Sequence, residues 1–93
     1  MPPTLLSADQ VQARLHELKG WSFQENAISK KVELKDFVRA MGFVNSVALL
    51  AEGMDHHPDI DIRWNRVLLT LSTHSAGGVT ENDFKLAKAI DGL

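Results

Sequence analysis

The chain has 93 residues, of which 44% are hydrophobic and 24% charged, and it contains no cysteine. This length supports one small domain with a thin core, so residues 1–93 are expected to form a single unit. A formal net charge of −2 without a basic stripe argues against direct binding of nucleic acid. The lack of cysteine excludes disulfides, thiolate catalysis and cysteine-bound zinc.

The beginning of the chain does not predict a targeting segment. Its first ten residues carry no basic side chain and no long apolar run, unlike a secretory signal. No apolar run along the chain approaches the ~20 residues of a membrane-spanning helix. We therefore expect a cytoplasmic protein with no membrane partner.

The first predicted element is a helix that begins at Ser7. Ser7 and Gln10 have the spacing of a capping box, in which each side chain accepts a hydrogen bond from the other residue's backbone N–H. Val11 and Leu18 mark an apolar stripe at helical spacing, and Gly20 is suited to ending the helix.

Four short segments alternate between apolar and polar residues and are predicted to be strands. They form two hairpins, with turns at Glu25-Asn26 and Asn65-Arg66. In each strand the apolar alternate positions would face the core. The predicted strands cover residues 21–24, 27–34, 59–64 and 67–73.

The longest predicted helix covers residues 35–52, and Gly53 is expected to end it. An ordinary surface helix has one apolar stripe, whereas this one is apolar on two sides. We infer that it packs on its own sheet and also on a partner subunit. The alternative is a helix buried within one subunit, which a chain this short can hardly enclose. The two sides consist of Phe37, Met41, Val44 and Ala48, and of Phe43, Val47 and Leu50.

The last predicted helix covers residues 81–91, with Thr80 as its N-cap and Asp83 in the capping-box position. The element order is therefore α-β-β-α-β-β-α. Two hairpins make a four-stranded antiparallel sheet, and the helices would cover one face of it. This arrangement is an α+β fold of two layers.

Three of the four histidines lie between Glu52 and Asp83, namely His56, His57 and His74. Imidazole is the side chain whose ordinary pKa, ~6.5, lies closest to neutral, so the cluster indicates proton chemistry or a metal site. Adjacent residues on extended chain point apart, which makes it hard for the histidine pair to grip one ion.

A zinc site remains conceivable, with two or three histidines plus Glu52 or Asp83 as ligands. The spacing does not favour it, because there is no HExxH and no i, i+4 histidine pair on a helix. Each residue alone also has a structural explanation, as a turn, strand-end or capping residue. Together they favour general acid–base catalysis on a bound small molecule, with no metal and no cofactor.

The spacing of these residues resembles that of the pterin-4a-carbinolamine dehydratase family. The family pattern has an acidic residue, then His-His-Pro, an aromatic residue, a histidine and an aspartate. Further similarity lies in segments 18–21, 35–43 and 71–74, and Asn82 departs from it where some relatives have a basic residue. In this sequence the pattern stands as Glu52, His56-His57-Pro58, Trp64, His74 and Asp83.

The resemblance implies a hydro-lyase that converts 4a-hydroxytetrahydropterin to quinonoid dihydropterin, which recycles the pterin of aromatic amino-acid hydroxylases. Hydroxide leaves from C4a with the help of an acid, and the N5 proton is lost to a base. By the family pattern His56 and His74 share these two roles, in an order that the sequence leaves open, and His57 binds and orients the substrate.

The resemblance also implies which residues support the substrate. The pterin ring would lie near Pro58 and Trp21, and its amino-pyrimidine edge would meet Glu52 or the backbone around Thr73. Asp83 would orient a histidine.

The family is further known for homotetramers built as dimers of dimers, which agrees with the doubly apolar helix. Some animal members also serve as dimerisation cofactors of homeodomain transcription factors. A protein-binding role toward a regulator or a hydroxylase is therefore the second hypothesis.

Overall fold

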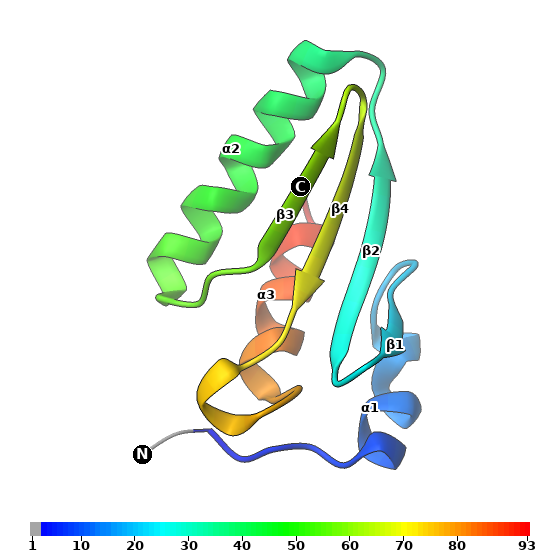
Figure 1. The fold of residues 1–93 in the computed structure, drawn as a ribbon, viewed down its shortest axis with the longest axis vertical. Coiled ribbons are helices and arrows are strands. Elements are labelled where there is room, and N and C mark those ends of the chain that lie inside the picture. The colour runs from blue at the N-terminus through cyan, green and yellow to red at the C-terminus, as the bar shows by residue number, and fades with distance from the viewer. Residues whose placement is uncertain (1–2) are drawn as a thin grey trace.

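The structure is a computed structural model that describes residues 3–93. It confirms the predicted α+β fold, with the element order α-β-β-α-β-β-α and the helices on one face of the sheet (Figure 1). The helices are α1 (Ala8–Arg14), α2 (Phe37–Met54) and α3 (Glu81–Asp91), with short 3-10 helices at Leu15–Glu17 and His74–Ala76. The strands are β1 (Ser22–Gln24), β2 (Ala27–Glu33), β3 (Asp59–Arg63) and β4 (Arg66–Leu71).

The four strands form one antiparallel sheet in the order β1-β2-β4-β3. The central strand β4 alternates as predicted, with Val67, Leu69 and Leu71 fully buried on the helix-covered face. Because neighbouring residues on a strand point to opposite faces, its other side chains lie on the face that no helix covers. That second face is polar and charged on β2 and β3 as well.

The first helix begins as predicted and ends earlier. Both halves of the Ser7–Gln10 capping box are present. The α-helix stops at Arg14 and tightens into a 3-10 turn, so Gly20 is not its cap. Gly20 instead takes a left-handed conformation, with φ of 80°, in the connection to β1.

The predicted Asn65-Arg66 turn is wrong by one residue. Arg63 pairs with Arg66, so the two turn residues are Trp64 and Asn65. Asn65 is fixed here because its side-chain amide donates to the Leu34 carbonyl at 2.9 Å, and its own carbonyl accepts from the Leu34 N–H at 2.8 Å. The first hairpin turn is where it was predicted, with positive φ at Glu25 and Asn26.

Helix α2 runs through Gly53 to Met54, contrary to the expectation that Gly53 would end it. The residue that ends it is Asp55, in a left-handed conformation with φ of 50° and its N–H donating to Ala51 and Glu52 carbonyls. Asparagine and aspartate tolerate this conformation better than most residues, which is why aspartate can replace glycine as the cap.

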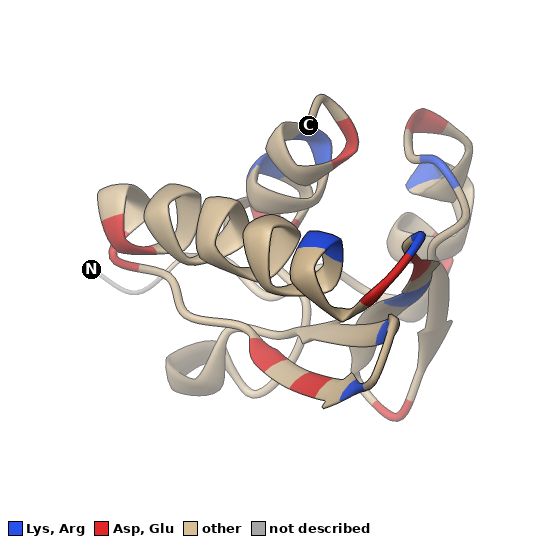
Figure 2. Cartoon of the chain, turned by 90° about the horizontal axis from the view of Figure 1, so that it is seen from above, with Lys and Arg blue, Asp and Glu red and all other residues tan. Residues whose placement is uncertain are grey.

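The apolar character of α2 exceeds what its own subunit buries. Ala40, Val47 and Ala51 are buried, whereas Val38 and Leu49 are 75% and 76% exposed. Figure 2 shows charged residues only toward the two ends of this helix. Within residues 3–93 it is also the one helix that length and composition would allow in a membrane, with a mean hydropathy of 1.2 and 22% of its residues buried. A single helix of this kind is weak evidence for a membrane span.

Candidate active site

The centre of the candidate site is the carboxylate of Asp83, which is 0% exposed at the start of α3. Its position follows from the local sequence, because Thr80 and Asp83 form the predicted capping box. The Asp83 Oδ2 atom accepts from the Thr80 N–H at 2.9 Å and from the Thr73 hydroxyl at 2.9 Å. A buried carboxylate needs such donors, since an unpaired charge in the interior is strongly unfavourable.

His56 supplies the donor to the other oxygen of Asp83. The left-handed residue Asp55 reverses the chain after α2, and the His56 N–H then donates to the Ala51 carbonyl at 3.0 Å. This turn directs the His56 ring to Asp83, with Nε2 and Oδ1 2.5 Å apart. Because an ionised carboxylate only accepts, the proton lies on Nε2 and leaves Nδ1 of the neutral ring as an acceptor.

Thr73 and Thr80 hold the carboxylate in a directed chain of hydrogen bonds. The single Thr73 hydroxyl proton goes to Asp83, so the Thr80 hydroxyl, 2.6 Å from Thr73 Oγ1, is the donor between them. Thr80 Oγ1 in turn accepts from the Asn82 N–H at 3.2 Å. Each buried hydroxyl is thereby satisfied, which fixes the orientation of the Asp83 side chain.

His74 lies on the exposed loop that follows β4. It follows Thr73 directly and begins the 3-10 turn His74–Ala76, whose loop is closed by the Thr73 N–H donating to Gly78 at 2.7 Å. Thr73 thus connects Asp83 with His74, because its hydroxyl donates to Asp83 and the next residue in the chain is the exposed His74. The Thr73–Asp83 contact therefore brings the backbone that leads to His74 close to the carboxylate that binds His56.

A second carboxylate–histidine pair lies beside the first and is exposed. His57 donates from Nε2 to Glu52 Oε1 at 2.8 Å, so the adjacent histidines reach different carboxylates. Glu52, His57 and Pro58 line a groove of about 610 Å³ between α2 and β3. The groove wall is otherwise mainly apolar and includes Leu49 and Ile60, whereas His56 and His74 are not among its lining residues. An apolar wall of this kind suits a flat heterocycle.

The hydrogen bond to Glu52 raises the pKa of His57 above its usual value, assisted by the charges of Glu52 and Asp55 and partly opposed by desolvation. We expect Glu52→Gln to lower this pKa toward ~6.5, because the amide keeps the shape and removes the charge. In the wild-type protein the raised pKa means that the His57–Glu52 pair stabilises the fold fully below the unfolded-state pKa of ~6.5. This contribution is lost as pH rises through the folded-state pKa of His57.

An NMR titration of the His57 ring protons measures this shift. The matched control is Glu33→Gln, which removes an exposed glutamate of β2. The His57 titration curve of the control should superimpose on that of the wild type. A Glu52→Gln curve that also superimposes would show that Glu52 does not raise the pKa of His57.

The two tryptophans lie away from this site. Trp21 was expected near the pterin ring, but it is 7% exposed and donates from Nε1 to Asp91 at 2.9 Å. Asp91 is eight residues after Asp83 along α3, which is a rise of about 12 Å. Trp21 is therefore a core residue at the other end of that helix, and Trp64 lies in the turn at the far end of β3.

Thr80 has a second role that its position as a helix cap did not predict. Thr80 was expected to start α3, and its hydroxyl additionally supports the Thr73–Asp83 contact. The signal was present in the Thr-x-x-Asp spacing, but a capping box does not reveal what else its carboxylate binds. Within residues 3–93, no three His, Cys, Asp or Glu side chains gather closely enough to hold a metal ion.

Comparison with known proteins gives the same assignment as the motif. The sequence profile described as pterin 4 alpha carbinolamine dehydratase matches residues 4–93. This chain belongs to that family. A relative of the dehydratase family from Roseiflexus sp. (strain RS-1) is 52% identical over 88 residues, covering 95% of both chains. Another from Sulfolobus acidocaldarius is 46% identical over 86 residues, covering 92% of this chain and 94% of its own.

Solved structures of dehydratase-like proteins share the fold. A transcriptional coactivator/pterin dehydratase from Brucella melitensis is 40% identical, with a TM-score of 0.90 over 94% of this chain and 95% of its own. A pterin dehydratase-like protein identified as a RuBisCO assembly factor in the alpha-carboxysome is 21% identical, with a TM-score of 0.65 over 80% of this chain and 88% of its own. At that identity the second likeness concerns the fold alone.

Proposed function

We propose that the protein dehydrates a 4a-hydroxytetrahydropterin to the quinonoid dihydropterin by histidine acid–base catalysis. The observation that carries this proposal is the buried Asp83 carboxylate, which is bound to His56 and to Thr73, the residue before the exposed His74. The reaction breaks the C4a–O bond, removes the N5 proton and forms the N5–C4a double bond. Water leaves with a proton taken from the acid, so one base and one acid suffice and no electrons are exchanged.

His56 is assigned the role of base. Its Nε2 proton is held by Asp83, so Nδ1 is the nitrogen free to accept the N5 proton. Asp83 then stabilises the imidazolium that forms, as the carboxylate of a catalytic triad does. The carboxylate itself needs no reorganisation, because Thr73 and the Thr80 N–H already hold it.

His74 is assigned the role of acid that protonates the departing hydroxyl. It is exposed on a separate loop, so it can approach the reacting carbon from a direction different from that of His56. The groove of Glu52, His57 and Pro58 would hold the ring, with the charged His57–Glu52 pair at its polar edge. After one turnover the acid has lost a proton and the base has gained one, and exchange with water restores both.

The test is the decay of freshly formed 4a-hydroxytetrahydropterin, followed by its ultraviolet absorbance with and without purified protein. We expect the protein to accelerate the decay at catalytic concentrations, and treatment with a chelator to leave the rate unchanged. A decay rate equal to that of buffer alone would contradict the proposed activity.

The exposed apolar side of α2 favours a second role, in which it binds another protein surface. Phe37 and Val38 are 50% and 75% exposed and lie outside the groove, and burying such side chains stabilises an assembly. We propose that a second copy of the chain covers this face, as expected for a homo-oligomer built as a dimer of dimers. A partner regulator or hydroxylase is the alternative occupant.

Substituting Val38→Asp is expected to reduce the wild-type oligomer to a smaller species, because the charge would be buried without a partner. Light scattering of eluted protein measures the mass. Gln12→Asp, at an exposed position of α1, is the control and should keep the wild-type mass. A monomeric wild type would refute the second-copy interface, and a monomer that captures a purified hydroxylase through α2 would favour the alternative.

A further inference from the structure

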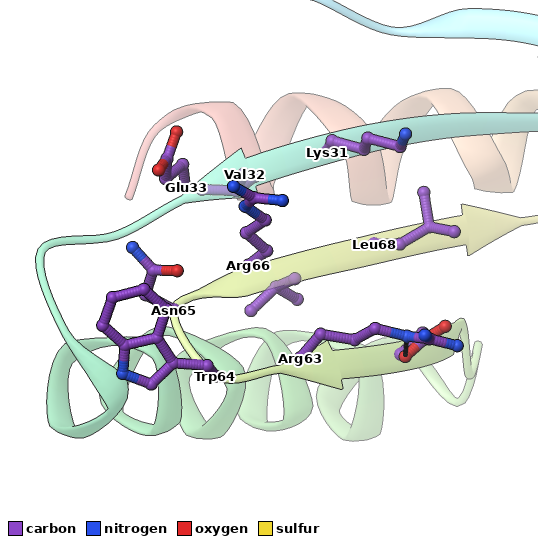
Figure 3. Close-up of a pocket in the computed structure, with 10 residues that line it drawn as sticks. Lys31, Val32, Glu33, Arg63, Trp64, Asn65, Arg66 and Leu68 are labelled. Carbon is purple, nitrogen blue, oxygen red and sulfur yellow. Dashed lines mark hydrogen bonds and ion pairs between the residues drawn. The ribbon is translucent and has the colours of Figure 1, made fainter.

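A second pocket, of about 910 Å³, lies at the turn of the β3–β4 hairpin (Figure 3). The candidate histidines belong to the segments at the other ends of these two strands. Its volume is in the range of small-molecule sites, ~300–1,000 Å³. The side chains of Lys31, Asp61 and Arg66 belong to it and alternate with core residues along their strands. The pocket is therefore on the face of the sheet that no helix covers.

The cations of this pocket come from three neighbouring strands, with Lys31 on β2, Arg63 on β3 and Arg66 on β4. Arg63 and Arg66 are direct cross-strand neighbours in the register, and like charges in such pairs are destabilising. Arg63 contacts Asp61 at 3.3 Å. Of the ion pairs within residues 3–93, none includes Arg66 or Lys31. Figure 3 shows Arg63 extending along β3, whereas Arg66 extends toward β2, so the two guanidinium groups point apart and Arg66 is available to an anion.

An aromatic platform stands next to these arginines. Trp64 is 68% exposed and has φ of 53°, a conformation that is unusual for a bulky residue. Such strain persists only where the surroundings impose it, and here Asn65 imposes it by its two hydrogen bonds to Leu34. The turn is thus held in place while its indole remains open to solvent, as labelled in Figure 3.

We propose that this pocket binds a small aromatic anion, meaning a planar ring that carries a carboxylate or a phosphate. The ring stacks on Trp64, and the anionic group receives hydrogen bonds from Arg66, whose planar fork matches such oxygens. Glu33 flanks Arg66 on the next strand and would repel polyanions, which limits the pocket to ligands of low charge. The proposal is independent of the proposed dehydration, because the six-residue strand β4 separates the two sites by about 20 Å.

The probes are phenyl phosphate and benzoate, with inorganic phosphate and benzyl alcohol as the anion-only and ring-only controls. Amide chemical shifts of the full chain are followed by NMR in low salt during titration. We expect shifts confined to residues 63–68 and neighbouring β2, and an affinity for one or both aromatic anions at least ~10-fold above either control. Whichever probe binds more tightly identifies the anionic group.

Two variants test the assigned contacts. Arg66→Gln should weaken the aromatic anion at least ~10-fold, since a hydrogen bond to a charged group is lost. Trp64→Asn keeps a residue that tolerates positive φ and should reduce affinity to that of the anion alone. Lys85→Gln, an exposed charge of α3, is the control and should bind as wild type does. Equal affinity for all probes, no binding at millimolar concentration, or shifts centred on the histidines would each overturn the proposal.

Discussion

Replacing His74 by alanine is expected to lower the rate of carbinolamine dehydration by ~10²-fold or more, the usual worth of one positioned acid or base. His74 is exposed and begins a 3-10 turn, so its removal should leave the Thr73–Asp83 contact and the fold in place. The rate is measured from the ultraviolet decay of the substrate, and circular dichroism checks the fold. The matched control is His16→Ala, which removes an exposed histidine of the first helical segment.

Added imidazole separates a lost proton donor from a lost structure. If His74 acts as the acid, free imidazole should restore part of the His74→Ala rate, with little effect on wild type. A His74→Ala protein that reacts at the wild-type rate would remove His74 from the mechanism. Loss of activity without any rescue, accompanied by a lower melting temperature, would reduce its role to a structural one.

Asp83→Asn is expected to lower the rate by a similar ~10²-fold or more, for a different reason. Oδ2 accepts from Thr73 and from the Thr80 N–H, so the amide oxygen of the substituted residue must take that position. Its NH₂ group then faces His56 Nε2 and donates to it. The proton of His56 moves to Nδ1, which can no longer accept the substrate's N5 proton.

The ¹⁵N chemical shifts of the His56 ring report this change directly. In wild type at a pH where the ring is neutral, Nε2 should carry the proton and Nδ1 should not; the variant should show the reverse. Glu52→Gln alters the other carboxylate–histidine pair and should leave the His56 pattern unchanged. A variant that keeps the wild-type pattern and rate would show that Asp83 neither sets the tautomer nor supports the base.

The fold was largely predictable because its local signals agree with one another. The capping boxes at Ser7 and Thr80 start α1 and α3 where expected, and strict alternation places Val67 and Leu69 in the core. The family pattern likewise named Asp83, whose contact with His56 is long-range and has no local sequence signal.

The errors have physical causes that involve partners distant in sequence. The hairpin turn is at Trp64 and Asn65 because Asn65 binds Leu34, thirty-one residues away. This contact outweighs the ordinary preference against a bulky residue at positive φ, which Trp64 adopts. Trp21 lies outside the candidate site because its indole N–H donates a hydrogen bond to Asp91. Helix α2 continues past Gly53 because the left-handed residue that ends it is Asp55 and not the expected glycine.

The most direct test is an experimental structure of the protein with a reduced pterin bound. We predict one pterin ring in the groove of Glu52, His57 and Pro58, with N5 within hydrogen-bond reach, ~3 Å, of His56 Nδ1, and with His74 near C4a. A ring that contacts only one of these two histidines, or that binds elsewhere on the molecule, would contradict it.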